Sequence, residues 1–259
     1  MIGVILAAGV GSRLRPMTND KPKCLVTTAG KPILQYQLDA YEEAGIKELV
    51  IVVGYEGQAV KEYLKYNKKF KINIIDNEIY EDSNNMYSLF LTKEYVKGKA
   101  FILNNADLSV ESCLISRMLA DERDDLVAVD VGLFNEESMK VTKNINGKIS
   151  DISKIIPKEK AVGCSIDFYK FSEKSSNRFF DEMEKIINID KNLKDWTEVA
   201  MQRLFHSQEL QFDIFDIEGI SWVEIDNYDD LALSDEIFSQ KKKKVTDYDY
   251  YCFDLDGTV

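Results

Sequence analysis

The chain has 259 residues, a mass of 29.7 kDa and a formal net charge of −12, with 45 acidic against 33 basic residues. Its content of 45% hydrophobic and 30% charged residues is that of an ordinary globular protein, which excludes collagen-like, low-complexity and wholly disordered chains. The acidic balance argues against nucleic acid as a partner, because duplex-binding proteins normally carry an excess of Lys and Arg.

No apolar run approaches the roughly 20 residues that span a bilayer, and the opening MIGVILAAG lacks the basic region of a signal peptide. The four cysteines, at positions 24, 113, 164 and 252, are scattered and form no CxxC pair. We therefore expect reduced thiols, a cytoplasmic location and no membrane partner. His206 is the only histidine, which leaves little material for a zinc site or a serine–histidine triad.

The first half of the chain alternates short β-type runs with helical patterns. Apolar runs predict strands at residues 2–6, 48–53, 72–75, 100–103 and 126–131. Helical spacing predicts one helix from Pro32 to about Gly45 and two more over 60–66 and 86–91. Strands that alternate with helices indicate a parallel, doubly wound α/β sheet.

From residue 139 onward the pattern becomes β-rich. Asn146-Gly147 predicts a hairpin turn within 139–155. Further strands are expected at 162–171, 210–217 and 222–225, and further helices around 179–187 and at 229–238. Such a late insertion is typical of a lid over a substrate. We expect one domain over residues 1–240 and a separate tail, beginning with four lysines, over 241–259.

A glycine-rich segment, Leu6-Ala-Ala-Gly-Val-Gly-Ser-Arg-Leu-Arg-Pro-Met-Thr, follows the first strand directly. Gly9 and Gly11 allow backbone amides to approach a ligand, and successive N–H groups can cradle phosphate oxygens. Arg13 adds a fork of donors suited to phosphate, and Lys23 adds a compact positive charge. A dinucleotide fold would need a third glycine where Leu14 stands, and a P-loop would need G-K-S/T. The alternative to a phosphate-binding loop is a glycine-containing turn with basic side chains on the protein surface.

Residues 6–25 resemble the signature of the nucleotidyltransferases that make nucleoside-diphosphate sugars and alcohols, L-A-A-G-x-G-S-R-L-x-P-x-T-x(3)-P-K-x-L, at every fixed position. The resemblance continues at Gly30-Lys-Pro-Ile and Val53-Gly-Tyr and covers nearly all of residues 1–240. A narrower likeness is to bacterial phosphocholine and 2-aminoethylphosphonate cytidylyltransferases. It rests on Asn84-Asn-Met-Tyr-Ser-Leu, Asn105-Ala-Asp-Leu, Ser153-Lys-Ile, Asp195-Trp-Thr-Glu and Trp222-Val-Glu-Ile-Asp-Asn. The resemblance implies a mixed, mainly parallel, Rossmann-like sheet with a small β-rich acceptor lid.

It also implies a Mg²⁺-dependent transfer of CMP from CTP to a small phosphate or phosphonate ester, of aminoalkyl or polyol type, with release of pyrophosphate. Arg13 and Lys23 are the expected catalytic residues, because neutralising the triphosphate charge is the main task. The expected nucleotide-binding residues are Leu6, Ala7, Ala8, Gly9, Gly11, Ser12, Arg13, Lys23, Gly54, Tyr55, Asn85, Ser88, Ala106 and Asp107. Asn85 has an alternative role as a helix cap, since Asn84 and Asn85 precede a helical run.

Two acids, Asp107 and Asp226, each follow a strand-like run, and ligands of open α/β sheets gather at the carboxyl ends of strands. Two carboxylates there can hold one Mg²⁺ together with phosphate oxygens and water, and the resemblance implies that use. Many members of the family carry an acid two residues before the first of these aspartates, where this chain has Asn105. Glu224 is a candidate to assist.

The acceptor is expected to contact Lys154, Asp167, Asp195, Trp196 and Glu198. Lys154 suits the acceptor phosphate, whereas acids beside an aromatic ring suit an aminoalkyl or quaternary ammonium group. Relatives that bind choline use several aromatic residues there, and Asp167 stands near one such position, which favours a primary amine or a polyol. The structural alternative places Trp196 in the core and the acids in solvent.

The tail segment Phe253-Asp-Leu-Asp-Gly-Thr-Val resembles the opening motif of haloacid-dehalogenase-type phosphatases. A working domain of that kind needs a far longer chain, so we expect no activity from the tail and a bifunctional parent protein. Alternative functions are a sugar-1-phosphate uridylyl- or thymidylyltransferase and a non-catalytic nucleotide-binding regulatory subunit, with UTP or dTTP as the alternative nucleotide. The oligomeric state stays open, and a homodimer is compatible with the sequence.

Overall fold

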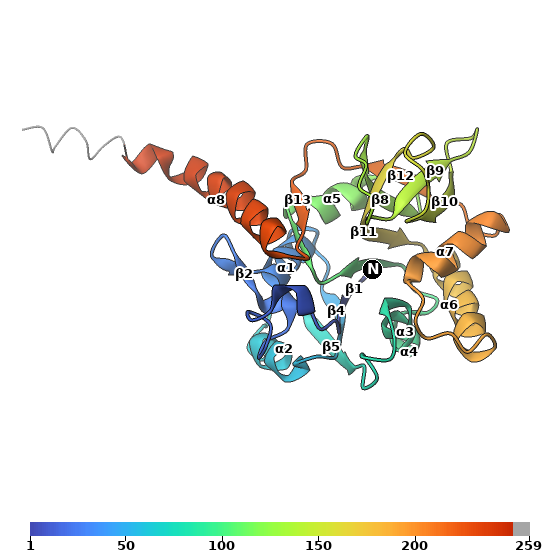
Figure 1. Cartoon of the computed structure of the whole chain (residues 1–259), viewed down its shortest axis with the longest axis horizontal. Coiled ribbons are helices and arrows are strands. Elements are labelled where there is room, and N and C mark those ends of the chain that lie inside the picture. The colour runs from blue at the N-terminus through green and yellow to red at the C-terminus, as the bar shows by residue number, and fades with distance from the viewer. Residues whose placement is uncertain (251–259) are drawn as a thin grey trace, which may run out of the picture.

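The computed structural model describes residues 1–250, and describes side chains through residue 239 (Figure 1). The strands are β1 Ile2–Ala7, β2 Thr27–Thr28, β3 Lys31–Pro32, β4 Glu48–Val53, β5 Lys71–Asp76, β6 Phe101–Asn105, β7 Leu108–Val110, β8 Leu126–Val131, β9 Lys140–Lys143, β10 Ile149–Ser153, β11 Gly163–Phe171, β12 Asp213–Asp216 and β13 Trp222–Glu224. The helices are α1 Ile33–Glu43, α2 Gly57–Leu64, α3 Asn85–Phe90, α4 Lys93–Val96, α5 Cys113–Ala120, α6 Glu173–Asn188, α7 Thr197–His206 and α8 Tyr228–Tyr250, with 3₁₀ turns at Ser12–Leu14 and Lys23–Leu25.

Nine of these strands form one mixed sheet in the order β10-β9-β11-β6-β1-β4-β5, with β8 beside β11 and β12 beside β8. The central strands β5, β4, β1 and β6 run parallel to one another. β11 pairs antiparallel with β6, β8 and β9, and β9 pairs antiparallel with β10. The expected α/β fold with a parallel centre and a β-rich extension is confirmed.

β1 shows why helices cover both faces of the sheet. All six of its residues are buried, and successive side chains of a strand point to opposite faces. Val4 and Leu6 join a core formed with α3, α6 and α7, whereas Ile5 and Ala7 join a second core formed with α1, α2 and α5. A strand that is covered on both faces has a continuous apolar sequence. Burying both faces of β1 requires helices on both sides of the sheet, which is the doubly wound arrangement.

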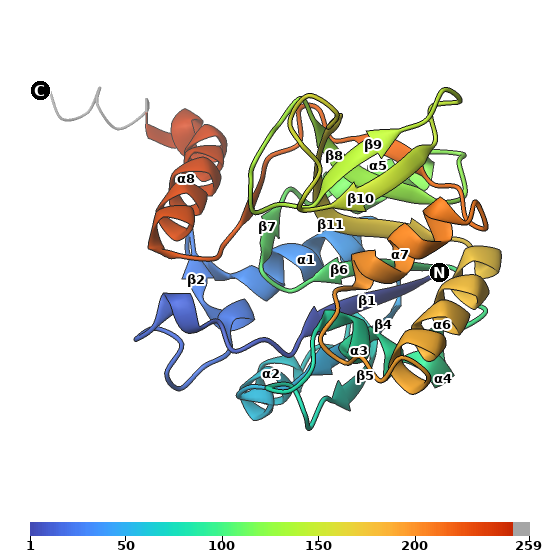
Figure 2. The ribbon, with the colours of Figure 1, turned by 45° about the vertical axis from the view of Figure 1, so that its right-hand side comes forward.

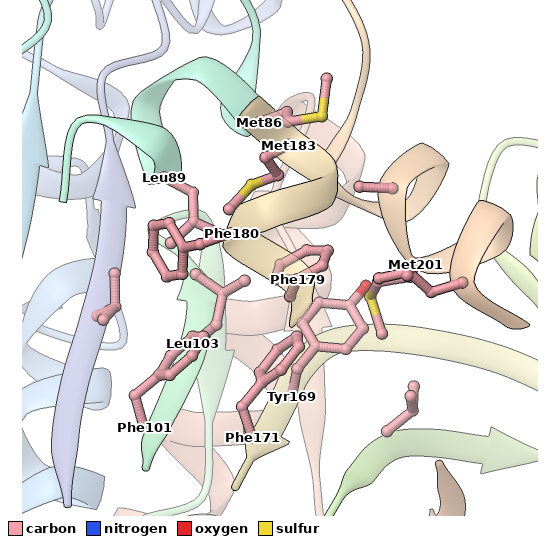
Figure 3. Packing of buried hydrophobic residues seen from close by; sticks show 14 of the residues in the cluster. Met86, Leu89, Phe101, Leu103, Tyr169, Phe171, Phe179, Phe180, Met183 and Met201 are labelled. Carbon is pink, nitrogen blue, oxygen red and sulfur yellow. The ribbon is translucent and has the colours of Figure 1, made fainter. Parts of the chain in front are cut away.

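The first core is rich in aromatic rings (Figure 3). Phe101 of β6 and Phe171 of β11 are register partners, and their ring centroids stack 4.5 Å apart. Phe179 of α6 stacks on the other side of Phe171, at 4.8 Å. These contacts lock β11 against β6, and β11 carries one of the acids expected at the acceptor site.

Several elements differ from the sequence-based expectations. α5, α7 and β7 were not expected, although α7 has the helical spacing of Ala200, Met201, Leu204 and Phe205 on its buried side. α8 continues to Tyr250 rather than ending near residue 238, because lysines favour a helix and nothing in the run breaks it. The motif at 253–259 lies outside the described residues (Figure 2).

The hairpin expectation is confirmed. β10 pairs antiparallel with β9, and Gly147 in the turn between them has φ 79°, a left-handed value that favours glycine. Over residues 1–250, no helix has the length and apolar character needed to cross a bilayer. Among the cysteines in that range, Cys24, Cys113 and Cys164 are free thiols.

Candidate active site

The loop that follows β1 depends on one glycine and one tyrosine. Gly11 has φ 63° and ψ 36°, and a Cβ added to it would lie 2.8 Å from the Cβ of Lys23. The loop and the Lys23 turn therefore pack together because residue 11 is glycine. The Tyr55 hydroxyl donates toward the carbonyl oxygens of Thr18 and Asn19, at 2.9 and 2.7 Å, and holds the far end of the loop.

Asp107 and Asp226 come together through strand register. β7 pairs antiparallel with β13, with Leu108 opposite Glu224, and the amide of Ile225 donates to the carbonyl of Asp107 at 2.9 Å. Asp107 follows a strand of the main sheet, as expected. Asp226 also follows a strand, but β13 and β7 form a separate two-stranded ribbon. The two acids therefore meet through this ribbon rather than along one edge of the main sheet.

Neighbouring side chains fix the backbone on either side of the two acids. The Nε2 group of Gln37 in α1 donates to the carbonyl oxygens of Asn105 and Leu108, both at 3.1 Å, and so holds the turn that carries Asp107. The Oδ2 atom of Asp230 in α8 accepts from the amide of Asp226 at 2.9 Å. Sequence reasoning missed both supports, although an acid in the first turn of a helix is a recognisable capping signal.

Two cations bind these acids directly. Lys23 Nζ lies 2.9 Å from Asp107 Oδ2 and 2.6 Å from Asp226 Oδ1, and Arg13 Nη2 lies 2.8 Å from Asp226 Oδ2. Burial opposes the charge on Lys23, yet the carboxylates of Asp107 and Asp226 raise its pKa above the ordinary value. Burial likewise opposes the charge on Asp226, and Lys23 and Arg13 nevertheless lower its pKa.

Glu224 completes a set of three carboxylates. Single oxygens of Asp107, Glu224 and Asp226 all lie within 4.8 Å of one another. Burial, with the nearby charges of Asp107 and Asp226, raises the pKa of Glu224 to about 7. Converging carboxylate oxygens are the donors that Mg²⁺ prefers, so this set fits that ion. Asn105 is engaged elsewhere, because its Nδ2 group donates to Asp167 Oδ2 at 2.8 Å.

The cations and acids line a cleft of about 390 Å³. Of the residues expected to bind nucleotide, acceptor or metal, it is lined by Leu6, Ala7, Ala8, Gly9, Gly11, Ser12, Arg13, Lys23, Asn85, Ser88, Ala106, Asp107, Lys154, Asp167, Trp196, Glu198 and Asp226. Gly54, Tyr55 and Asp195 lie outside this lining. Gly54 instead packs behind the loop, where an added Cβ would lie 2.7 Å from the Ala8 carbonyl oxygen.

Polar side chains around α3 form one part of the cleft lining. Asn84 is the N-cap of this helix, because its Oδ1 atom accepts from the amide of Asn85 at 2.8 Å. The Oδ1 atom of Asn85 accepts from the amide of Thr197 at 3.0 Å, so the capping role belongs to Asn84. Asn77, which sequence reasoning missed, donates to the hydroxyl of Ser88 at 3.0 Å.

Another part of the lining holds a network of acids around Tyr169. Tyr169 donates its hydroxyl toward Asp167 Oδ1 at 2.9 Å and Glu198 Oε1 at 2.6 Å. Burial raises the pKa of Asp167 well above its ordinary value, and the nearby charge of Glu198 adds to the effect. Glu198 is buried and Asp167 is half-buried, so neither acid is fully exposed to solvent.

Trp196 and Lys154 form the rim beside this network. Trp196 is 42% exposed, so it belongs to the cleft and not to the core. Lys154 Nζ lies 4.9 Å from the centre of the Trp196 ring, within cation–π range. The Lys154 ammonium therefore already lies over the indole ring in this part of the cleft lining.

Comparison with known proteins agrees with this geometry. The family model described as "Nucleotidyl transferase" matches residues 2–138. Choline-phosphate cytidylyltransferase of Streptococcus pneumoniae (strain ATCC BAA-255 / R6) is 30% identical over 248 residues, which cover 93% of this chain and 100% of the relative. CTP:phosphoglutamine cytidylyltransferase of Campylobacter jejuni is 27% identical over 258 residues, with 91% and 100% coverage. A solved structure of CTP:phosphocholine cytidylyltransferase from Streptococcus pneumoniae matches in fold, with a TM-score of 0.71, 24% identity and coverage of 92% of this chain and 99% of that chain.

Proposed function

The chain belongs to the nucleotidyl transferase family, and on that premise we propose that it transfers CMP from CTP to a small phosphate or phosphonate ester and releases pyrophosphate. The observation that carries the proposal is the convergence of two cations, Arg13 and Lys23, with three carboxylates on one wall of the cleft. Such an arrangement suits a polyanionic substrate with a bound divalent ion. The relatives named above as cytidylyltransferases support CMP as the transferred group.

In the proposed reaction an oxygen of the acceptor phosphate bonds to the α-phosphorus of CTP. The bond from that phosphorus to the bridging oxygen breaks, and pyrophosphate leaves with the electron pair. A phosphate monoester is largely dianionic near neutral pH, since its second pKa is about 6, so no general base is required. This agrees with the position of His206, which faces Asp151 at 3.3 Å and does not line the cleft.

Charge neutralisation and positioning then have to lower the barrier. Arg13 and Lys23 supply positive charge next to the glycine loop, whose amides can receive phosphate oxygens. Asp107, Glu224 and Asp226 would hold Mg²⁺, which when bound supplies further positive charge to the triphosphate. The Nδ2 group of Asn85 is a donor suited to the acceptor atoms on a pyrimidine edge.

For the acceptor we propose an aminoalkyl or polyol phosphoester. Lys154 lines the cleft and suits the acceptor phosphate, while the half-buried Asp167 and the buried Glu198 suit a positively charged or hydroxylated tail. The left-handed backbone of Asp167, with φ 55°, aims its carboxylate toward Asn105 and Tyr169. The anionic lining favours an amine over a second acidic group.

A pyrophosphate-release screen tests the proposal. CTP, UTP and dTTP are each paired with phosphocholine, phosphoethanolamine, 2-aminoethylphosphonate, glycerol phosphates and a hexose 1-phosphate, in the presence of Mg²⁺. We expect release with CTP and one of the small phosphoesters, and loss of release in Asp107→Asn. Release only with the hexose 1-phosphate would contradict the acceptor class, and no release with any pair would contradict catalysis.

A further inference from the structure

Lys23 contacts two of the three carboxylates that fit a metal ion. Its ammonium bridges Oδ2 of Asp107 and Oδ1 of Asp226, two of the three carboxylates that converge at the cleft wall. The second oxygen of Asp226 is taken by Arg13. The side chain of Lys23 is only 13% exposed, so the bridge is largely shielded from solvent. Lys23 and a divalent ion therefore compete for the carboxylates of Asp107 and Asp226.

The competition follows from distances. A Mg²⁺ ion binds carboxylate oxygens at about 2.0–2.1 Å, while the Lys23 nitrogen is already 2.6 and 2.9 Å from those oxygens. Both cations on the same oxygens would come within a few ångströms of each other at a site with little solvent. Like charges at that range repel strongly. The metal therefore needs Lys23 to leave, and a buried lysine leaves only when another anion receives it.

The triphosphate is such an anion, because Gly9, Gly11, Ser12 and Arg13 line the same cleft as Lys23. We propose that Lys23 occupies the metal position at Asp107 and Asp226 until a bound triphosphate draws its ammonium away, so that the divalent ion and the nucleotide bind cooperatively. The inference rests on the proposed function, since it assumes a nucleotide triphosphate in this cleft. By thermodynamic linkage, each ligand then increases the affinity for the other by the same factor.

Binding of Mn²⁺ in the absence of nucleotide tests the inference without turnover. Free Mn²⁺ is followed by electron paramagnetic resonance during titration of the full chain, as wild type and as Lys23→Met. We expect Lys23→Met to bind Mn²⁺ at least about tenfold more tightly, which corresponds to about 1.4 kcal/mol. Lys61→Met is the matched control. It also removes one positive charge and an ion pair, to Asp76 at 2.6 Å, but it lies outside the cleft, so its affinity should equal that of wild type.

Two further variants keep the result interpretable. Lys23→Gln provides a second neutral side chain, and circular dichroism verifies that each variant is folded. In Lys23→Met/Asp226→Asn the gained affinity should disappear, because the ion is expected on that carboxylate. Equal Mn²⁺ affinities of wild type and both Lys23 variants would overturn the inference, as would a gain that survives Asp226→Asn or also appears in Lys61→Met. Pyrophosphate release by the wild-type protein is measured separately, so failure of the proposed function shows in that assay alone.

Discussion

Two alanine substitutions in the glycine loop test two different roles of glycine. Gly11→Ala tests whether the backbone conformation requires glycine, and Gly9→Ala tests whether the ligand needs the space that a Cβ would fill. Gly11 has a left-handed backbone, which costs alanine about 1–2 kcal/mol. Its new Cβ would also lie 2.8 Å from Lys23 Cβ, and such overpacking costs about 1–3 kcal/mol. The lower entropy of the unfolded alanine chain returns about 0.4–1 kcal/mol. We therefore expect Gly11→Ala to lose about 2–4 kcal/mol of unfolding free energy.

Gly9 provides the contrast, because a Cβ added there meets nothing within 4 Å and its φ is not left-handed. Gly9→Ala should therefore keep or slightly raise stability. The same Cβ would project toward the space where phosphate oxygens approach the loop amides, so we expect CTP to bind about tenfold more weakly, or about 1.4 kcal/mol.

Thermal denaturation and isothermal titration with Mg·CTP measure the two effects. For a chain of this size, the loss in Gly11→Ala corresponds to a fall in Tm of roughly 5–15 °C. A Gly11→Ala protein as stable as wild type would refute the strain argument. A Gly9→Ala protein that binds CTP normally would refute the placement of phosphates on this loop.

Three further predictions follow from single contacts. Lys23→Ala should lower turnover roughly a hundred- to a thousandfold with an unchanged circular dichroism spectrum, as expected when one charge-stabilising contact is removed; near-normal turnover would count against its catalytic role. Asp230→Ala removes the acceptor for the Asp226 amide and should cost about 1 kcal/mol of stability. It should also raise the Mg²⁺ concentration needed for half-maximal activity. Asp230→Asn keeps an acceptor oxygen and should restore both properties, and failure of that rescue would refute the positioning role. Asp167 has a raised folded-state pKa, so between its ordinary 3.8 and that higher value the folded state holds a proton that the unfolded state has lost, and stability falls as pH rises through this window. Asp167→Asn should remove that fall, so its Tm advantage over wild type should grow as the pH rises through this window, and parallel pH profiles of Tm would contradict the assignment.

The sequence by itself determined the centre of the fold and the glycine loop with its two cations. The runs at 2–6 and 49–53 are apolar and buried because helices cover both faces of β1 and β4, so their composition records their burial. The glycine loop, Arg13 and Lys23 lie close together in the sequence. Their combination of backbone amides and positive charges can therefore be recognised without knowledge of the fold. Helix α7 was equally readable from its apolar spacing.

Only the tertiary structure decided which residues that are distant in the sequence meet in the cleft, and which cations contact them. Asp107 and Asp226 are far apart in the chain, and the register of β7 against β13 brings them together through hydrogen bonds that no local pattern encodes. The same register adds Glu224 to the carboxylate set, and Lys23, from a separate turn, bridges Asp107 and Asp226. Packing also buried Glu198 and left Gly54 behind the loop. Pairing between remote strands and burial in a shared interior depend on the whole chain, and therefore these features appear only once it is folded.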